Sequence, residues 1–562
     1  MTAHQGPHSP STMSPPGAVG ATTVPPRPDP PVHQPPRFGW TSNFASSPPP
    51  LLLSFALGAL CVAGFAPLGW SLVPMIALAE MIVIWARARS PRYAAAHGFA
   101  FGLGLFGVGV SWVYVSLADF GGMPWPLAAL ATALFCSILA LYPAAIGYLQ
   151  ARLGGRIVLS ALLVTPALWT LGEWMRDTIT GFPWLAFGYA QLPHGPLAGY
   201  APIVGVYGVS FCMALTSGLA VAILSSVRSV HRTDPRSGPA EGAENLRWRA
   251  ALKRGLSGIS YAIAVLALFL AGQALRQVEW TEPAGLPLKV ALLQGNIAQD
   301  QKFVDGWYDR TLATYRELAF ASDARLIVWP ETAIPRLLHH VDPDLLEDLR
   351  SQAAAKNADM LIGIPFRDVE GSYYNSMFSF GVSPTQAYSK THLVPFGEFI
   401  PAGFDWILAI LQIPLANFSP GSDHPKPLEV AGQKVAINLC YEDVFGAEII
   451  RQLPAATLLV NASNVAWFGH SMAPAQHLQI SQMRALESGR PMLRATNTGM
   501  TAAIDAKGIV LKSLPQFVQG ALVTSVQPRS GATPFVLAGN APVVALSLLL
   551  LALGYLLTRR NY

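Results

Sequence analysis

The sequence predicts two joined parts, a polytopic α-helical membrane domain and an extramembrane domain of the α/β class. Of its 562 residues, 52% are hydrophobic and only 12% are charged, whereas roughly a quarter of the residues are charged in ordinary soluble domains. Apolar residues concentrate between about 50 and 276 and again near 535–558, while residues 287–530 carry the charges of a globular domain. The chain therefore occupies two environments.

Eight apolar segments approach the length of about 20 residues with which an α-helix crosses a bilayer. The first two are short, and little more than a turn at Pro67 and Gly69 separates them. The segments lie near residues 50–67, 70–86, 94–116, 124–150, 157–174, 201–227, 255–276 and 535–558. We predict seven transmembrane helices within residues 49–280 and an eighth at 535–558.

Basic residues cluster after every second crossing, whereas the loops after the first, third and fifth crossings carry only Arg176. They follow the even-numbered crossings as Arg87, Arg89, Arg92, Arg152, Arg156, Arg228, Arg232, Arg236, Arg247, Arg249, Lys253, Arg254, Arg559 and Arg560. Because cationic loops stay in the cytoplasm, we predict cytoplasmic chain ends, including residues 559–562. Residues 287–530 then lie in the periplasm of a bacterium with two membranes. This topology also explains the net charge of +5, so we expect no nucleic-acid partner.

The first 48 residues are rich in Pro, Ser, Gly and Thr and have no apolar periodicity. Such a composition cannot bury enough apolar surface to fold. The segment also lacks the apolar core and cleavage site of a secretory signal. We predict that residues 1–48 form a disordered cytoplasmic tail, and that the transmembrane segments direct insertion into the inner membrane.

Of the four cysteines, only one lies in the extramembrane domain. Cys61, Cys136 and Cys212 fall within apolar crossings, where a small, weakly polar side chain packs readily. Cys440 has no second cysteine for an internal disulfide. The sequence contains neither Cys and His at metal-ligand spacing nor a Gly-rich phosphate loop. We therefore predict no metal, nucleotide or organic cofactor.

Short apolar runs of strand length recur through the extramembrane domain, and helical periodicity marks residues 305–322 and 473–489. Continuous apolar strands are typical of sheets that are covered on both faces. Three of these strands run into Glu331, Lys390 and Cys440. Taken singly, each residue has a structural alternative, as a helix N-terminal carboxylate, a surface charge or a buried hydrophobe. Together they form a coherent nucleophile site, because a thiol needs a cation and a base.

Several longer motifs resemble known ones. WPETAIP (329–335), YSKTHLVPFGEFIP (388–401) and CYED (440–443) resemble the Glu, Lys and Cys motifs of the nitrilase superfamily. The chain is similar to one membrane branch of that superfamily, the apolipoprotein N-acyltransferases, on the evidence of SNVAWFG (463–469), RALESGRPMLRATNTG (484–499), GEWMRD (172–177) and TGFPWLAFGYAQ (180–191). The resemblance covers nearly everything after the tail and implies an α-β-β-α sandwich for residues 287–530. The chain departs from the family pattern at Phe303, where Trp is expected, and at Val465, where Asp is expected.

The resemblance implies the last step of lipoprotein maturation, in two half-reactions. Glu331 would act as the general base and Cys440 as the nucleophile, taking an acyl chain from a membrane phospholipid as a thioester. The α-amino group of a diacylglyceryl-cysteine, at the N-terminus of an apolipoprotein, would then accept the chain. Lys390, with the backbone N–H of Tyr441, would stabilise the oxyanions. We expect the enzyme to be monomeric.

Further residues are assigned supporting roles. Glu398 would orient the lysine or cap the loop after it, Glu442 belongs to the cysteine motif, and Asn464 would fix a loop near the nucleophile. Apolar residues that could line a lipid entrance, or equally pack in the core, are Trp184, Phe303, Tyr388, Trp467 and Phe468. His477 is interpreted as a hydrogen-bonded, partly buried histidine outside the catalytic set.

Two other functions are compatible with parts of the sequence. The same triad would serve a membrane-tethered amidase or nitrilase-type hydrolase that uses water as the second nucleophile. A transporter would carry ionisable residues inside its crossings, and Glu80 and Glu173 are the visible candidates. Ammonia release from simple amides would support the hydrolase. Loss of transport in a Glu80→Gln variant would support the transporter.

Overall fold

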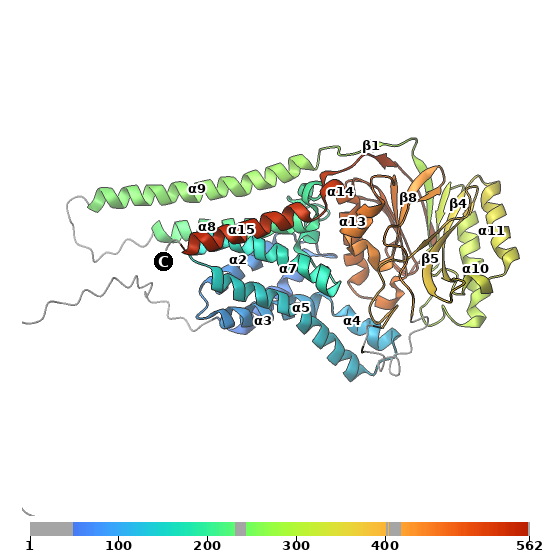
Figure 1. Cartoon of the computed structure of the whole chain (residues 1–562), viewed down its shortest axis with the longest axis horizontal. Helices are drawn as coiled ribbons and strands as arrows, with labels where there is room; N and C mark the ends of the chain where they lie inside the picture. Colours follow the sequence, from blue (N-terminus) through green and yellow to red (C-terminus); the bar gives the residue numbers. More distant parts are fainter. Residues whose placement is uncertain (1–48, 231–242, 401–402, 404–416, 560–562) are drawn as a thin grey trace, which may run out of the picture. The chain divides into compact units, whose positions relative to one another are not determined.

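The computed structural model describes residues 49–230, 243–400, 403 and 417–559 (Figure 1). Side chains are not described for residues 228–230, 243–254 and 305. The predicted tail (1–48), the end of the chain from Arg560 onward, and the loop arginines Arg232 and Arg236 lie outside the described residues.

Every predicted crossing contains a helix. The helices are α1 (Leu51–Cys61), α2 (Val73–Ala86), α3 (Pro91–Gly109), α4 (Trp112–Val115), α5 (Trp125–Leu153), α6 (Ile157–Leu159), α7 (Thr165–Thr180), α8 (Ala201–Val230), α9 (Ala243–Leu275) and α15 (Ala541–Arg559). In the described part of the chain, five spans are long and apolar enough to cross a membrane, namely Trp125–Leu153, Ile157–Thr180, Ala198–Val227, Gly255–Leu275 and Ala541–Arg559. A sixth would be a pair bent by 49°, Pro91–Gly109 with Trp112–Phe120. The helices at Leu51–Gly64 and Val73–Ala86 are shorter.

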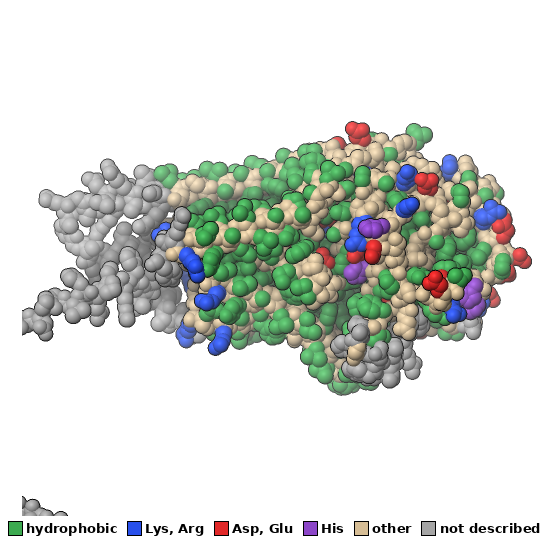
Figure 2. All heavy atoms as spheres, viewed as in Figure 1, with side chains coloured by type: hydrophobic (Ala, Val, Ile, Leu, Met, Phe, Trp, Pro, Cys, Tyr) green, Lys and Arg blue, Asp and Glu red, His purple; other side chains and the backbone are tan. Residues whose placement is uncertain are grey.

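Two predicted helix bounds were wrong. The fifth span continues to Thr180 rather than ending near 174, so the whole GEWMRD motif (172–177) is helical. It ends where Gly181 adopts a left-handed conformation, which only glycine adopts without cost. The eighth span begins at Ala541 rather than 535, because a separate short helix, α14 (Pro534–Ala538), ends at Gly539 with φ 57°. Figure 2 shows hydrophobic side chains over the surface of the helical part and charged ones over the α/β part.

Two six-stranded sheets make up the α/β part. One has the order β13-β2-β3-β4-β5-β6 and contains β2 (Leu288–Gln294), β3 (Leu326–Val328), β4 (Asp359–Arg367), β5 (Tyr373–Gly381), β6 (Ala387–Ser389) and β13 (Gly520–Val526). The other has the order β12-β11-β10-β9-β8-β7 and contains β7 (Leu428–Val430), β8 (Gln433–Leu439), β9 (Leu458–Ser463), β10 (Met492–Thr496), β11 (Ala502–Ile504) and β12 (Val510–Ser513). A two-stranded pair, β1 (Glu282–Pro283) with β14 (Arg529–Ser530), lies where the domain joins the membrane helices.

One buried cluster joins the two sheets, because it contains Val290 and Leu361 of the first and Ile437 and Val460 of the second. The outer face of the first sheet packs against α10 (Asp305–Phe320) and α11 (Pro343–Ala355). The outer face of the second sheet packs against α13 (Ala473–Ser488). Figure 1 shows these helices on the outer sides of the paired sheets. Strands β3, β9, β10 and β11 are buried along their whole length, and β2, β4, β5 and β8 along most of theirs.

Helix α13 is buried around almost its whole circumference, although its sequence has polar positions typical of a half-exposed helix. The membrane helices cover the face that points away from the sheet. Trp112 and Trp184 donate their indole N–H groups to Gln476 Oε1, at 3.3 and 2.7 Å. The backbone N–H of Val206, freed by the break of α8 at Gly205, donates to Glu487 Oε1 at 2.5 Å. Gln476 and Glu487 of α13 are thus hydrogen-bonded to the membrane part of the chain.

Candidate active site

Glu331 follows β3 and is held by three donors. Its carboxylate accepts the side-chain amide of Asn375 at 2.8 Å and the backbone N–H of Asn464 at 2.9 Å. The ammonium of Lys390 lies 3.4 Å from the same carboxylate. The segment before Glu331 is rigid, because Trp329 is fully buried and stacks on Tyr315 with ring centroids 5.1 Å apart. The carboxylate is therefore fixed in one orientation.

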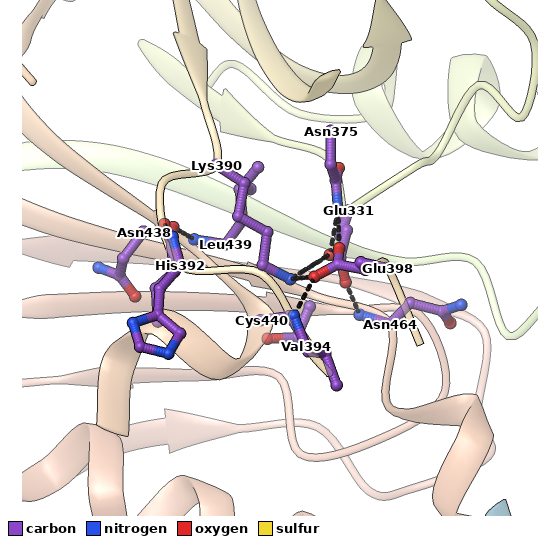
Figure 3. A network of polar contacts seen from close by, with 12 residues as sticks. Glu331, Asn375, Lys390, His392, Val394, Glu398, Asn438, Leu439, Cys440 and Asn464 are labelled. Carbon is purple, nitrogen blue, oxygen red and sulfur yellow. Dashed lines mark hydrogen bonds and ion pairs between the residues drawn. The ribbon is translucent and has the colours of Figure 1, made fainter. Parts of the chain in front are cut away.

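Lys390 follows β6 and is 1% exposed. Its ammonium lies 2.8 Å from Glu398 Oε2 and 3.4 Å from Glu331 Oε1, and Figure 3 shows it reaching between the two carboxylates. Asn375 donates to Glu398 as well as to Glu331, each at 2.8 Å. Glu398 also accepts the backbone N–H of Val394 at 2.8 Å, which closes the loop after the lysine. One buried cation thus bridges two carboxylates.

Cys440 lies where β8 ends and is partly exposed. Its φ of 50° is unusual for a residue with a Cβ atom, and such strained positions cluster at functional sites. The side-chain amide of Asn461 donates to the Cys440 carbonyl at 2.9 Å and so supports this conformation. The chain turns sharply at the cysteine, as a nucleophile at a strand end requires.

The protonation states follow from burial and neighbouring charges. Burial raises the pKa of the Cys440 thiol and Glu331 raises it further, while Lys390 lowers it. Burial opposes ionisation of Glu331, but Lys390 and the Asn375 amide hold the pKa of Glu331 below its usual value. Burial would neutralise Lys390, but Glu398 and Glu331 raise its pKa above the usual value. The resting site therefore pairs a neutral thiol with an ionised base, so the thiol must lose its proton during attack.

Glu442 organises the loop that carries the lysine and the turn that carries the cysteine. Its carboxylate accepts the backbone N–H groups of Thr391, His392 and Leu439, at 2.6, 3.0 and 2.6 Å. It also accepts the hydroxyl of Tyr388 at 2.8 Å. A buried carboxylate with four donors joins these two segments in one arrangement.

We expect Glu442→Ala to lower the free energy of unfolding by about 3 kcal/mol, because it leaves several buried donors without an acceptor. Thermal unfolding of the detergent-solubilised protein measures this effect. Glu429→Ala is the matched control, since Glu429 is an exposed carboxylate on β7 of the same domain. Equal unfolding temperatures for the two variants would contradict the role given to Glu442.

The family model of the apolipoprotein N-acyltransferase N-terminal domain matches residues 57–219, and that of carbon-nitrogen hydrolases matches residues 288–534. The chain is 47% identical over 510 residues to the apolipoprotein N-acyltransferase of Nitrosomonas europaea, covering 90% of this chain and 97% of the relative. The chain belongs to the apolipoprotein N-acyltransferase family. Relatives of the same name from Methylococcus capsulatus and Ralstonia nicotianae are 41% and 43% identical, each over 91% of this chain and over 97% and 93% of their own lengths.

These matches confirm the family predicted from the motifs. Relatives in the family are matched over nearly their whole length, and both the membrane part and the α/β part of this chain are recognised. The chain is therefore a member of the acyltransferase family with a nitrilase-like domain, and its apolar helices indicate a membrane protein. Glu173, the buried candidate for transport, accepts the indole N–H of Trp169 and the backbone N–H of Phe187, each at 2.9 Å, which gives it a structural role.

The aromatic residues predicted to line a lipid entrance occupy three different places. Trp184 is buried against Trp112 and His477, with ring centroids 5.1 and 5.4 Å away. Tyr388 lies in the core between the sheets and bonds Glu442. Phe303 is 36% exposed. Contact of each with lipid stays a prediction.

The other two aromatic residues lie in the short helical turn Val465–Phe468, directly after Asn464. Phe468 packs edge-on against Trp112 at 4.8 Å, and the Trp467 carbonyl accepts the Ser116 hydroxyl at 2.8 Å. This turn is therefore continuous with the site on one side and with the bent membrane helix on the other. Val465, the family departure, is buried within the same turn.

Tyr441 and His477, which the sequence analysis also named, both form hydrogen bonds. The Tyr441 hydroxyl donates to the carbonyl of Gly181, next to the end of α7. His477 is buried and bonds Asp443 at 2.6 Å, as expected for a structural histidine. Among the described residues, no group of three His, Cys, Asp or Glu could hold a metal ion.

Two site residues were missed from the sequence. Asn375 lies at a buried position of β5 and bonds both carboxylates, and the signal was a polar residue inside the apolar run YNSMFSF. Lys302 is buried and donates to the Glu331 carbonyl at 3.1 Å. The sequence around Lys302 is polar and carries no sign that the lysine is buried.

Proposed function

We propose that this protein is a phospholipid:apolipoprotein N-acyltransferase that works through a Cys440 thioester. The observation that carries the proposal is the meeting of Cys440 with the Glu331–Lys390–Glu398 cluster, in a chain that belongs to this family. All of these residues come from one chain, in keeping with a monomer. The substrates are a membrane phospholipid and a diacylated apolipoprotein.

In the first half-reaction, Glu331 accepts the thiol proton as Cys440 Sγ attacks the ester carbonyl of the phospholipid. The ammonium of Lys390 and the backbone N–H of Tyr441 stabilise the oxyanion of the tetrahedral intermediate. The intermediate collapses with cleavage of the ester C–O bond, and Glu331 returns its proton to the departing alkoxide. The products are a thioester on Cys440 and a lysophospholipid.

In the second half-reaction, the α-amino group of the diacylglyceryl-cysteine attacks the thioester carbonyl. Glu331 takes a proton from the attacking amine, and the same donors stabilise the second oxyanion. Cleavage of the C–S bond releases the Cys440 thiolate, which recovers the proton from Glu331. The product is an amide, and the apolipoprotein carries a third acyl chain.

We also propose the complete arrangement of eight crossings, with cytoplasmic ends and a periplasmic α-β-β-α sandwich at residues 287–530. Exposed arginines after α2 and α5, among them Arg89 and Arg156, support this orientation. A single cysteine placed at Asp323 in a Cys440→Ala background should react with a membrane-impermeant maleimide in spheroplasts. One placed at Arg89 should react only after lysis, and the three native cysteines left in that background are buried. The reverse labelling pattern would contradict the orientation.

The function is tested by incubating the purified protein with a phospholipid labelled in its acyl chain and a synthetic diacylated lipopeptide. We expect the label to move to the lipopeptide as an alkali-stable amide. A lipopeptide with an acetylated N-terminus is the matched control and should accept no label. Release of free fatty acid or of ammonia from simple amides, with no labelled lipopeptide, would favour the membrane-tethered hydrolase instead.

A further inference from the structure

A second lysine, which the reaction above does not use, lies within the site. Lys302 is 4% exposed, and its amine donates to the backbone carbonyl of Glu331 at 3.1 Å. Lysine is almost never fully buried unless its amine is paired. The carbonyl is a neutral partner, so the positive charge of Lys302 is available to the ionisable groups around it.

The segment that carries Lys302 is fixed to the rest of the site by asparagines. Asn497 accepts the backbone N–H of Ile297 at 3.0 Å and donates to its carbonyl at 2.7 Å. The side chain of Asn464 donates to Gln299 at 2.7 Å, while its backbone N–H binds the Glu331 carboxylate. The same polar network thus fixes the lysine and the carboxylate next to it.

Lys302 adds a second positive charge beside Glu331. Lys390 lies between the carboxylates of Glu331 and Glu398, so both share its charge. A buried charge without a partner is costly, and a buried carboxylate without one takes up a proton instead. An ammonium that bonds the Glu331 main chain therefore favours the ionised form of this carboxylate.

We propose that Lys302 is a positioning residue for acyl transfer, whose amine fixes the main chain of Glu331 and keeps that carboxylate ionised and ready to accept the Cys440 proton. The inference rests on the proposed thioester mechanism. The proton moves from Sγ to Glu331, and Lys302 keeps its own protons throughout.

The electrostatics agree with this geometry. Burial alone would raise the pKa of Glu331. The cations that help to keep this pKa below its usual value are Lys390 and, after it, Lys302. Burial lowers the pKa of Lys302 to about 8, while Glu331 and Cys440 oppose that change. The other ionisable groups that act on Lys302 or Glu331 are Lys390, Cys440 and Arg494, and Glu398 acts on Lys390.

The test is the pH dependence of Cys440 acylation in single-turnover reactions with phospholipid vesicles alone. In Lys302→Met, Glu331 should hold its proton to higher pH, so the acid limb of the rate profile moves upward. We expect a rate loss on the order of tenfold at the low-pH end. The two profiles should converge above about pH 8, where the parent lysine is itself neutral.

Three further variants separate this role from simple packing. Lys302→Gln keeps an N–H donor for the Glu331 carbonyl but lacks the charge, so it should show the same shift. Lys302→Arg keeps the charge and should return the acid limb toward the parent position. Lys434→Met removes an exposed lysine on β8 and should leave the profile unchanged.

The possible outcomes separate the role of Lys302 from the thioester mechanism on which that role depends. A parent protein that forms no acyl adduct at any pH would overturn the thioester mechanism and this inference with it. The parent could be acylated while Lys302→Met and Lys302→Gln either follow the parent profile or lose rate equally at every pH. Either result would overturn only the role of Lys302. Should Lys302→Met not fold, Lys302→Gln decides the question, and loss of folding in both would assign Lys302 a purely structural role.

Discussion

Replacing Glu331 by Gln is expected to slow the acylation of Cys440 about a thousandfold, the scale on which a positioned general base acts. The Cys440 thiol is neutral at rest because burial and Glu331 both raise its pKa, so attack requires a base at that moment. Glutamine has nearly the same shape and can still accept the Asn464 N–H bond. It cannot accept the thiol proton. Single-turnover formation of the acyl adduct with phospholipid alone measures the effect.

Folding must be checked beside that rate, because the new glutamine side chain would present an amide to one of the donors that now bind the Glu331 carboxylate. We expect a loss of about 1–3 kcal/mol in the free energy of unfolding, too little to unfold the protein. Glu370→Gln is the matched control, since Glu370 is an exposed carboxylate in a turn of the same domain. A Glu331→Gln variant that acylates at the parent rate would assign the base to another group.

Lys390→Met is expected to lower the acylation rate between about a hundredfold and a thousandfold, because it removes the charged donor for the oxyanion. It should also lower the free energy of unfolding by about 3–5 kcal/mol at neutral pH. Two carboxylates, the buried Glu331 and the partly buried Glu398, would lose the cation that lies 3.4 and 2.8 Å from them. Burial, no longer opposed by Lys390, would then raise the pKa of Glu331 above its unfolded value. Part of the stability lost at neutral pH should therefore return as the pH falls and Glu331 takes up a proton.

A second substitution separates the two effects of losing Lys390. Adding Glu398→Gln removes one of the unpaired negative charges, so the double variant should recover much of the stability. It should recover none of the rate, because the oxyanion donor is still absent. Recovery of rate in the double variant, or a Lys390→Met variant as stable as Lys434→Met, would contradict the account of this cluster.

Much of the α/β domain could be predicted because its strands are continuous apolar runs that end in chemically active residues. The runs that lead to Glu331, Lys390 and Cys440 are β3, β6 and β8. Strands β7, β12 and β13 were not predicted. They lie at the edges of the sheets and are short or only half-buried, so no continuous apolar run marks them.

Contacts between distant segments account for most of what the sequence could not predict. The burial of α13 depends on Trp112 and Trp184, which lie roughly 300 residues or more earlier in the chain. Lys302 is buried because Asn497, about 200 residues later, fixes its loop. No local pattern encodes either contact. The family motifs predicted the candidate triad and the supporting residues Glu398, Glu442 and Asn464, but not Asn375 or Lys302.

The central claim is that Cys440 carries the acyl chain as a thioester, and intact-protein mass spectrometry tests it most directly. The purified protein is incubated with a phospholipid of defined acyl chains and no acceptor, then divided into samples with and without neutral hydroxylamine. We expect the parent to gain the mass of one acyl chain, to lose it in hydroxylamine, and to produce one equivalent of lysophospholipid. Cys440→Ala should gain nothing. An unmodified parent with intact phospholipid, or an adduct that persists in Cys440→Ala, would contradict the claim.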